Sequence, residues 1–219
     1  MLAFDIGANR GDWVHAALAK GYDVIALEPG AIYGELAKSF IYDQRVTPLK
    51  FAVSDKDYER VEFYEADEDG LSTLNKDWLT KDTMPYAGKP YKVISATTIT
   101  LDTLAKIYGE PDLIKVDVEG AEWSVFRGMT QKMGMISFEW TDVTLDEHNQ
   151  QLDYLDTLGY IEVAPQFIEH HCQIPLNWYP LHKFDLSGWL LDNHKDWIDG
   201  GWKVSGLRPT ADVGMVFCR

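Results

Sequence analysis

The stretch that decides the fold spans residues 2–12 and reads LAFDIGANRGD. Its first five residues are mostly apolar and predict a buried strand. Gly7 and Gly11 follow, and glycines let the backbone turn tightly where a ligand approaches the main-chain N–H groups. A helical pattern then runs over residues 12–20. A strand, a glycine turn and a helix in this order predict the first unit of a parallel α/β sheet.

The same alternation of short apolar runs and helical patterns continues along most of the chain. Further strands are predicted over residues 24–27, 49–53, 113–118, 135–140, 160–163 and 213–218. Helices are predicted over residues 32–41, 101–108, 121–127 and 146–158. We therefore expect a single domain over residues 1–219, built as a doubly wound α/β fold around a mostly parallel sheet.

Two segments interrupt the alternation. Residues 56–97 contain two extended segments, 61–64 and 91–94, and we expect an excursion over the rim of the sheet. Residues 164–212 hold four of the eight tryptophans and four of the six histidines. Structureless loops of that length are uncommon in compact domains, so we expect an aromatic-rich, cap-like insert before the last strand, with secondary structure of its own.

Composition excludes several classes of protein. Apolar residues make up 46% of the 219 residues and charged residues 25%, as in a folded globular chain. The 20 basic and 35 acidic side chains leave a net charge of −15, which repels nucleic acid and anionic membranes. The sequence shows no basic leader and no long apolar run, so we expect a soluble cytoplasmic protein. Cys172 and Cys218 lack metal-site spacing and are interpreted as packing residues.

A nucleotide site is predicted at the first turn. Glu28 closes the second predicted strand, where an acid can accept hydrogen bonds from a ribose diol. A dinucleotide fingerprint needs glycines where this turn has Asn9 and Asp12, and the charge of Asp12 opposes a pyrophosphate. Asp5 can instead receive the amino group of an amino-acid moiety. The pattern favours S-adenosylmethionine, with an NAD-dependent oxidoreductase as the alternative.

Six blocks of sequence carry a family resemblance. They are FDIGANRG (4–11), EP (28–29), AVSD (52–55), GLSTL (70–74), TLDTL (100–104) and IKVDVEGAE (114–122). In this order they resemble the FkbM-type family of S-adenosylmethionine-dependent methyltransferases, over about residues 3–140. The resemblance implies a Rossmann-like class I methyltransferase fold of seven strands, with the last strand antiparallel. It also implies methyl transfer to a hydroxyl oxygen of a carbohydrate, glycan or polyketide-like small molecule.

The resemblance further suggests which residues bind the cofactor. The methionine end would be held by Asp5, Gly7, Asn9 and Gly11. The ribose would be held by Glu28 and Pro29, and the adenine would be flanked by Phe51, Ala52 and Val53. An apolar slot edged by backbone polar groups suits adenine on general grounds, although Phe51 also fits a plain core position.

Two carboxylates are candidates for the chemical step. Asp117 and Glu139 end neighbouring predicted strands, and open parallel sheets bind ligands at that edge. Either could act as general base or as a positioning acceptor for the attacking hydroxyl, and Asp117 could also contact the cofactor. Lys115 lies on the same face of its strand as Asp117, so a buried structural ion pair is the alternative. Clustered carboxylates could also bind Mg²⁺, but our prediction is no metal.

The acceptor is predicted to contact five residues. These are Ser72 and Thr73 in a loop that resembles the family's Ser/Thr segment, Glu119 nearby, and His170 and Trp178 in the aromatic insert. Planar rings and polar groups together suit a sugar, although the insert's tryptophans could equally form its own small core. A small-molecule or glycan acceptor is expected and nucleic acid is not, while the oligomeric state stays open. A non-catalytic nucleotide-binding module of the same fold is a third hypothesis.

Overall fold

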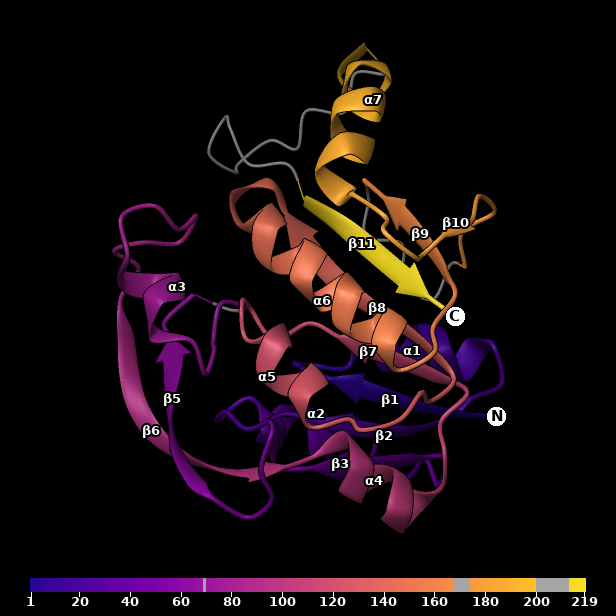
Figure 1. Cartoon of the computed structure of the whole chain (residues 1–219). Coiled ribbons are helices and arrows are strands. Elements are labelled where there is room, and N and C mark those ends of the chain that lie inside the picture. Colours follow the sequence, from indigo (N-terminus) through magenta and orange to yellow (C-terminus); the bar gives the residue numbers. More distant parts are fainter. Residues whose placement is uncertain (69, 168–173, 200–212) are drawn as a thin grey trace.

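The structure of the protein is a computed structural model that describes residues 1–68, 70–167, 174–199 and 213–219 (Figure 1). The strands of its large sheet are β1 (Leu2–Ile6), β2 (Asp23–Leu27), β3 (Val46–Leu49), β7 (Leu113–Val116), β8 (Met135–Thr141), β9 (Glu162–Gln166), β10 (Tyr179–Pro180) and β11 (Val213–Cys218). A smaller sheet contains β4 (Ala52–Val53), β5 (Arg60–Ala66) and β6 (Tyr91–Ile99).

The helices connect these strands. They are α1 (Asp12–Ala19), α2 (Tyr33–Ser39), α3 (Lys76–Thr80), α4 (Leu101–Tyr108), α5 (Glu122–Arg127), α6 (Leu145–Thr157) and α7 (Leu186–Asp199), with a short 3₁₀ helix η1 (Asp142–Thr144). Thr100 caps α4, because its side chain accepts a hydrogen bond from the Thr103 N–H. No helix in the described part of the chain is long and apolar enough to cross a membrane.

The order of strands confirms the predicted fold class. The large sheet runs β10-β9-β11-β8-β7-β1-β2-β3, and the pairs from β3 to β8 are all parallel. The last strand, β11, is antiparallel to both β8 and β9, as expected. The predicted count of seven strands is wrong by one, because the two-residue strand β10 adds an antiparallel edge to β9. A strand of two residues, such as β10, is too short to show the alternation of apolar and polar residues by which strands are predicted from sequence.

Helices cover both faces of the sheet, because strand residues alternate sides. Phe4 and Ile6 of β1 point into the larger core, which α4, α5 and α6 cover with Leu104, Phe126 and Leu155. Ala3, also on β1, points into the opposite core, which contains residues of α1 and α2: Trp13, Val14, Ala17 and Leu36. The first crossover and the later helices therefore lie on opposite faces, which makes the sheet doubly wound.

The predicted strand over residues 49–53 is wrong as a single element. The structure ends β3 at Leu49 and begins β4 at Ala52, which leaves the large sheet and pairs with β6. Ala52 is buried against Phe63 and Ala96 of the smaller sheet. Tertiary packing therefore divides one apolar run between two sheets.

The rim excursion is an antiparallel hairpin. The two extended segments expected near residues 61–64 and 91–94 are β5 and β6, which pair from Arg60↔Thr97 to Ala66↔Tyr91. In Figure 1 this long hairpin stands to one side of the large sheet, with α3 in the connection between its strands. It carries its own small cluster around Trp78 and Leu79.

The aromatic insert has secondary structure in its described part. It contributes β10 and α7, and Leu186 and Leu190 of α7 join the larger core. Trp189 packs against Trp140 and Phe167, with ring centroids 6.2 and 4.9 Å away. His170, Cys172 and Trp202 lie outside the described residues, as do the side chains of His194 and Trp197.

Gly7 is required by a close approach of two backbone segments. A Cβ added there would lie 1.8 Å from the Asp117 carbonyl oxygen, and φ is +80°. We expect Gly7→Ala to lower the free energy of unfolding by about 3 kcal/mol or more. Gly21 is the matched control, because its φ is +87° but a Cβ there would meet nothing within 4 Å. Gly21→Ala should cost about 1 kcal/mol, and equal losses in chemical denaturation would contradict the steric argument.

Candidate functional site

The turn after β1 is shaped by hydrogen bonds to the neighbouring strand. The N–H groups of Gly7 and Ala8 both donate to the Leu27 carbonyl, at 3.0 and 2.9 Å. Asn9 has φ +47°, a left-handed conformation that asparagine tolerates better than most residues. Gly11 has φ +94°, and a Cβ there would lie 2.4 Å from the Phe40 ring. Gly7, Asn9 and Gly11 thus suit the left-handed backbone of this turn. The two glycines also leave space for the groups packed against them.

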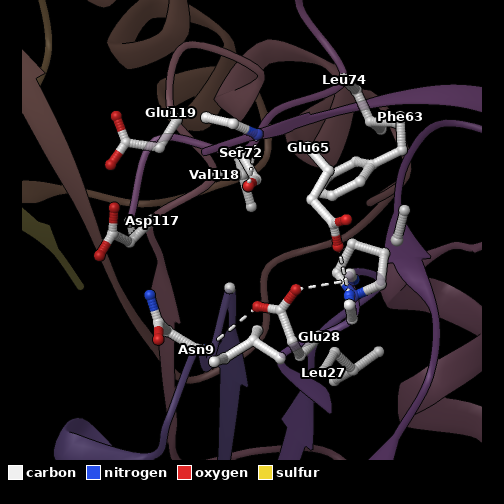
Figure 2. A pocket seen from close by; sticks show the side chains of 18 of the residues that line it. Asn9, Leu27, Glu28, Phe63, Glu65, Ser72, Leu74, Asp117, Val118 and Glu119 are labelled. Carbon is white, nitrogen blue, oxygen red and sulfur yellow. Dashed lines mark hydrogen bonds between the residues drawn. The ribbon is translucent and has the colours of Figure 1, made fainter. Parts of the chain in front are cut away.

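A cavity of about 360 Å³ opens beside this turn, at the carboxyl edge of the sheet (Figure 2). It brings together most of the predicted cofactor residues: Gly7, Asn9, Glu28, Pro29, Phe51, Ala52, Val53 and Asp117. Ser72 and Glu119 from the predicted acceptor set also line it. Asp5 and Gly11 do not. The cavity thus combines an apolar wall of Phe51, Ala52 and Val53 with the carboxylates of Glu28 and Asp117.

Glu28 is held in place by two backbone groups. One carboxylate oxygen accepts the Gly30 N–H at 2.8 Å and the other accepts the Asn9 N–H at 3.1 Å. The residue is only 6% exposed, and burial raises its pKa despite these two bonds. Each oxygen keeps a further lone pair, so Glu28 can still accept hydrogen bonds from a diol in the cavity.

Asp5 lies beneath the cavity wall in a buried ion pair. The Lys115 ammonium lies 3.3 Å from Asp5 Oδ1 and 3.1 Å from Asp117 Oδ2, and it donates to the Gly7 carbonyl at 2.9 Å. The structural alternative considered for Lys115 is therefore present. Because Asp5 is fully buried and faces Lys115, we do not assign it a direct contact with a ligand.

Three carboxylates gather near the carboxyl ends of β7 and β8. Asp117 directly follows β7, whereas Glu139, expected at a strand end, lies within β8, which continues to Thr141. Asp117, Glu119 and Glu139 present oxygens that all lie within 4.8 Å of one another. Glu119 has φ +56°, and the indole N–H of Trp78 donates to its carboxylate at 3.1 Å. Burial, followed by the charge of Asp117, raises the pKa of Glu119 well above its usual range. Such a cluster could hold a proton or a hard cation, and the absence of a metal stays a prediction.

A second, smaller cavity adjoins the cluster. Glu139 lines it together with Trp78, Trp140, Thr144 and His148. Asp117 and Glu119 line the first cavity, so the carboxylate cluster lies between the two. The second cavity is small, about 20 Å³, which is room for about one water molecule.

Two of the predicted acceptor residues lie elsewhere. Thr73 is 1% exposed, and its hydroxyl accepts the Asn75 N–H at 2.8 Å, which is a turn interaction. Trp178 packs under Arg219, whose guanidinium lies 4.0 Å from the ring centroid, and lines neither cavity. Arg219 follows the antiparallel strand β11, so this contact lies at the opposite edge of the sheet. His170 lies outside the described residues.

Sequence reasoning missed three residues near the cavities: Glu65, Trp78 and Tyr86. Glu65 lines the first cavity and Trp78 the second. Burial and then the charges of Glu119, Glu139 and Asp117 raise the pKa of Tyr86, which remains a neutral phenol beside the cluster. All three come from the rim excursion, and no motif or spacing in that segment could have singled them out.

Comparison with known proteins identifies the family. The chain matches the methyltransferase FkbM domain over residues 5–162, and it belongs to that family. The family resemblance drawn from the six blocks is therefore confirmed. Membership favours the methyltransferase hypothesis over the NAD-dependent one. No curated protein matches the chain.

Two solved methyltransferase structures are similar to the chain at low identity. One is a precorrin-6y C5,15-methyltransferase from Geobacter metallireducens, at 16% identity and a TM-score of 0.42, with 100% of this chain and 79% of that chain covered. An S-adenosylmethionine-dependent O-methyltransferase from Thermotoga maritima has 12% identity and a TM-score of 0.41, with 99% and 58% covered. At these values neither structure carries an argument about chemistry.

His148 makes the stability depend on pH. Its Nε2 accepts the Thr141 N–H at 3.2 Å, so Nδ1 carries the proton and donates to Gln151 Oε1 at 2.9 Å. Burial lowers its pKa from 6.5 to about 4. The neutral imidazole therefore contributes stability above pH 6.5, and about 3 kcal/mol should be lost as the pH falls from 6.5 to 4.

Denaturation at several pH values checks this expectation. His148→Gln should be less stable than wild type at pH 7.5, but its stability should fall less steeply between pH 6.5 and 4. His182→Gln is the control, because the side chain of His182 is 73% exposed. If the wild type and His148→Gln lost stability in parallel on acidification, His148 would not be the titrating group.

Proposed function

We propose that this protein is an S-adenosylmethionine-dependent O-methyltransferase that acts on a hydroxyl of a carbohydrate, glycan or polyketide-like small molecule. One observation carries the proposal: two adjoining cavities meet at the carboxylates of Asp117, Glu119 and Glu139. The first cavity has the features of a nucleoside site. The second is small, about 20 Å³, and carries Glu139 on the far side of the cluster, which is the side where we place the acceptor. Membership of the FkbM methyltransferase family supports the transfer of a methyl group.

The first cavity fits the cofactor chemically. Phe51, Ala52 and Val53 supply an apolar wall that suits adenine, and Glu28 faces the cavity as an acceptor for ribose hydroxyls. Gly7 and Asn9 line the end near Asp117, where the amino-acid moiety would bind. When bound, S-adenosylmethionine supplies a methyl group already activated by the sulfonium charge. The chain must therefore position the acceptor oxygen, exclude water and take up one proton.

The carboxylate cluster is suited to taking up that proton. As the hydroxyl oxygen formed a bond to the methyl carbon, the bond from that carbon to the sulfonium sulfur would break and release S-adenosylhomocysteine. The hydroxyl proton would pass to Asp117 or Glu139, which line the first and the second cavity. Carboxylates this close cannot all stay ionised at low cost, so they readily share a proton. Burial, and then the charge of Asp117, raises the pKa of Glu119, so a proton taken up by the cluster can be held on Glu119.

Aromatic side chains near the second cavity favour a ring-shaped acceptor. Trp78 lines it, and the Tyr86 ring lies 5.7 Å from that of Trp78. Trp140 also borders it, but this side chain is fully buried in the core and offers no face to a ligand. Planar aromatic faces cover the apolar faces of sugars, while carboxylates accept hydrogen bonds from sugar hydroxyls. This combination supports a carbohydrate or another polyhydroxylated small molecule as acceptor.

Cofactor binding is the first test. Isothermal calorimetry should show binding of S-adenosylhomocysteine to the wild type, about tenfold weaker binding to Glu28→Gln because one charged acceptor is lost, and unchanged binding to Glu110→Gln. Glu110 is the matched control, since it is exposed after α4 and lines neither cavity. Binding of NADH without binding of S-adenosylhomocysteine would overturn the proposal.

Methyl transfer is the second test. A screen with radiolabelled S-adenosylmethionine over sugars, glycans and polyketide alcohols should identify an acceptor. With that acceptor, Asp117→Asn and Glu139→Gln should each lower kcat by about 10²-fold or more, because a positioned proton acceptor is lost. Asp153→Asn, an exposed change on α6, should leave kcat unchanged. Full activity in both cluster variants would show that neither carboxylate takes the proton.

A further inference from the structure

The rim hairpin forms one wall of the cofactor cavity. Phe63 and Glu65 of β5 and Leu74 of the following loop line it opposite the β2 edge (Figure 2). The side chain of Glu65 in this wall is only 11% exposed. Burying a charged carboxylate to this extent costs free energy unless it is paired. The carboxylate of Glu65 therefore needs hydrogen-bond or charge partners.

Glu65 is bonded to the loop that follows Glu28. One of its carboxylate oxygens accepts the Ala31 N–H, and the other lies 2.7 Å from the Lys92 ammonium on β6. Glu28 accepts the preceding N–H, that of Gly30, at 2.8 Å. Two carboxylates from distant parts of the chain therefore hold two consecutive peptide groups of one short loop.

The loop fits closely between the two acids. A Cβ added at Gly30 would lie 3.0 Å from Glu28 Oε1 and 3.0 Å from Glu65 Oε1. Figure 2 shows both carboxylates directed toward this loop, from β2 and from β5. A shift of the loop would therefore disturb the hydrogen bond that orients Glu28.

We propose that Glu65 is a positioning residue for cofactor binding: it fastens the loop of residues 29–31 to the rim hairpin and so orients Glu28 toward the ribose hydroxyls. The inference rests on the proposed function, because it assumes that a nucleoside occupies the cavity. Glu65 acts through the loop and Glu28, and it needs no contact of its own with the ligand.

Charge compensation keeps Glu65 suited to this role. Burial by itself would raise its pKa, but the bonds from Lys92 and Ala31 outweigh burial and hold the pKa below its usual range. Glu65 therefore stays ionised at neutral pH, and an ionised acceptor bonds a backbone N–H more strongly than a neutral one. Lys92 is itself 62% exposed, so the pair needs no second buried charge.

The proposal is tested by changing both the protein and the ligand and measuring the binding affinity of each combination. Calorimetry would compare S-adenosylhomocysteine with its 2′,3′-dideoxyribose analogue, which lacks the hydroxyls that Glu28 would contact. Glu65→Ala should weaken binding of S-adenosylhomocysteine about tenfold and Glu65→Gln about threefold. For the analogue, both variants should lose less than twofold relative to wild type. Glu62→Gln, on the opposite face of β5, is the matched control and should change neither affinity.

A double-mutant cycle of Glu28 and Glu65 distinguishes a positioning role of Glu65 from a role in packing alone. If Glu65 acts through Glu28, the double variant Glu28→Gln/Glu65→Ala should bind S-adenosylhomocysteine no more weakly than Glu28→Gln alone. Unchanged binding to Glu65→Ala, or equal losses for both ligands, would overturn the proposal. If Glu65→Ala does not fold, Glu65→Gln carries the test because it keeps the side-chain volume. Failure of the wild type to bind S-adenosylhomocysteine would instead overturn the proposed function.

Discussion

A single buried ammonium group joins the parts of the site. Lys115 on β7 pairs with Asp5 on the neighbouring β1 and with Asp117 beyond its own strand, and it donates to the carbonyl of Gly7 in the first turn. A charge that is only 5% exposed is costly without partners, so the two carboxylates and the carbonyl must stay in place around it. Lys115 therefore fixes the position of the turn at Gly7 relative to Asp117, the predicted proton acceptor.

The rim hairpin extends that framework to the open side of the cavities. On the cofactor side Glu65 bonds the Ala31 N–H. On the acceptor side the Asn75 side chain donates to the Gly120 carbonyl at 2.9 Å, and Trp78 donates to Glu119. One excursion therefore contributes to both cavities and contacts the segments that carry Glu28 and the carboxylate cluster. The two extended segments of this excursion indicated only that it passes over the rim of the sheet.

Local signals account for the successful predictions. The run from Leu2 to Gly11 determines a strand and a turn through neighbouring residues, and the position of Glu28 follows from the strand that it ends. These elements lie close together because parallel strands meet at one edge. The prediction for Thr73 rested on the resemblance to the family's Ser/Thr segment, and that for Trp178 rested on residue type. Neither fixes the position of the side chain in space. Packing and pairing place both away from the cavities.

The sequence by itself determined the doubly wound α/β class, the glycine turn, the acid after the second strand and the family, because these depend on short-range patterns of apolar residues and on blocks of contiguous residues. Only the tertiary structure decided that Lys115 links Asp5 and Asp117, that three carboxylates meet between two cavities, and that Glu65 reaches Ala31 across 34 positions of sequence. Such contacts depend on how distant segments pack, and no local periodicity encodes them.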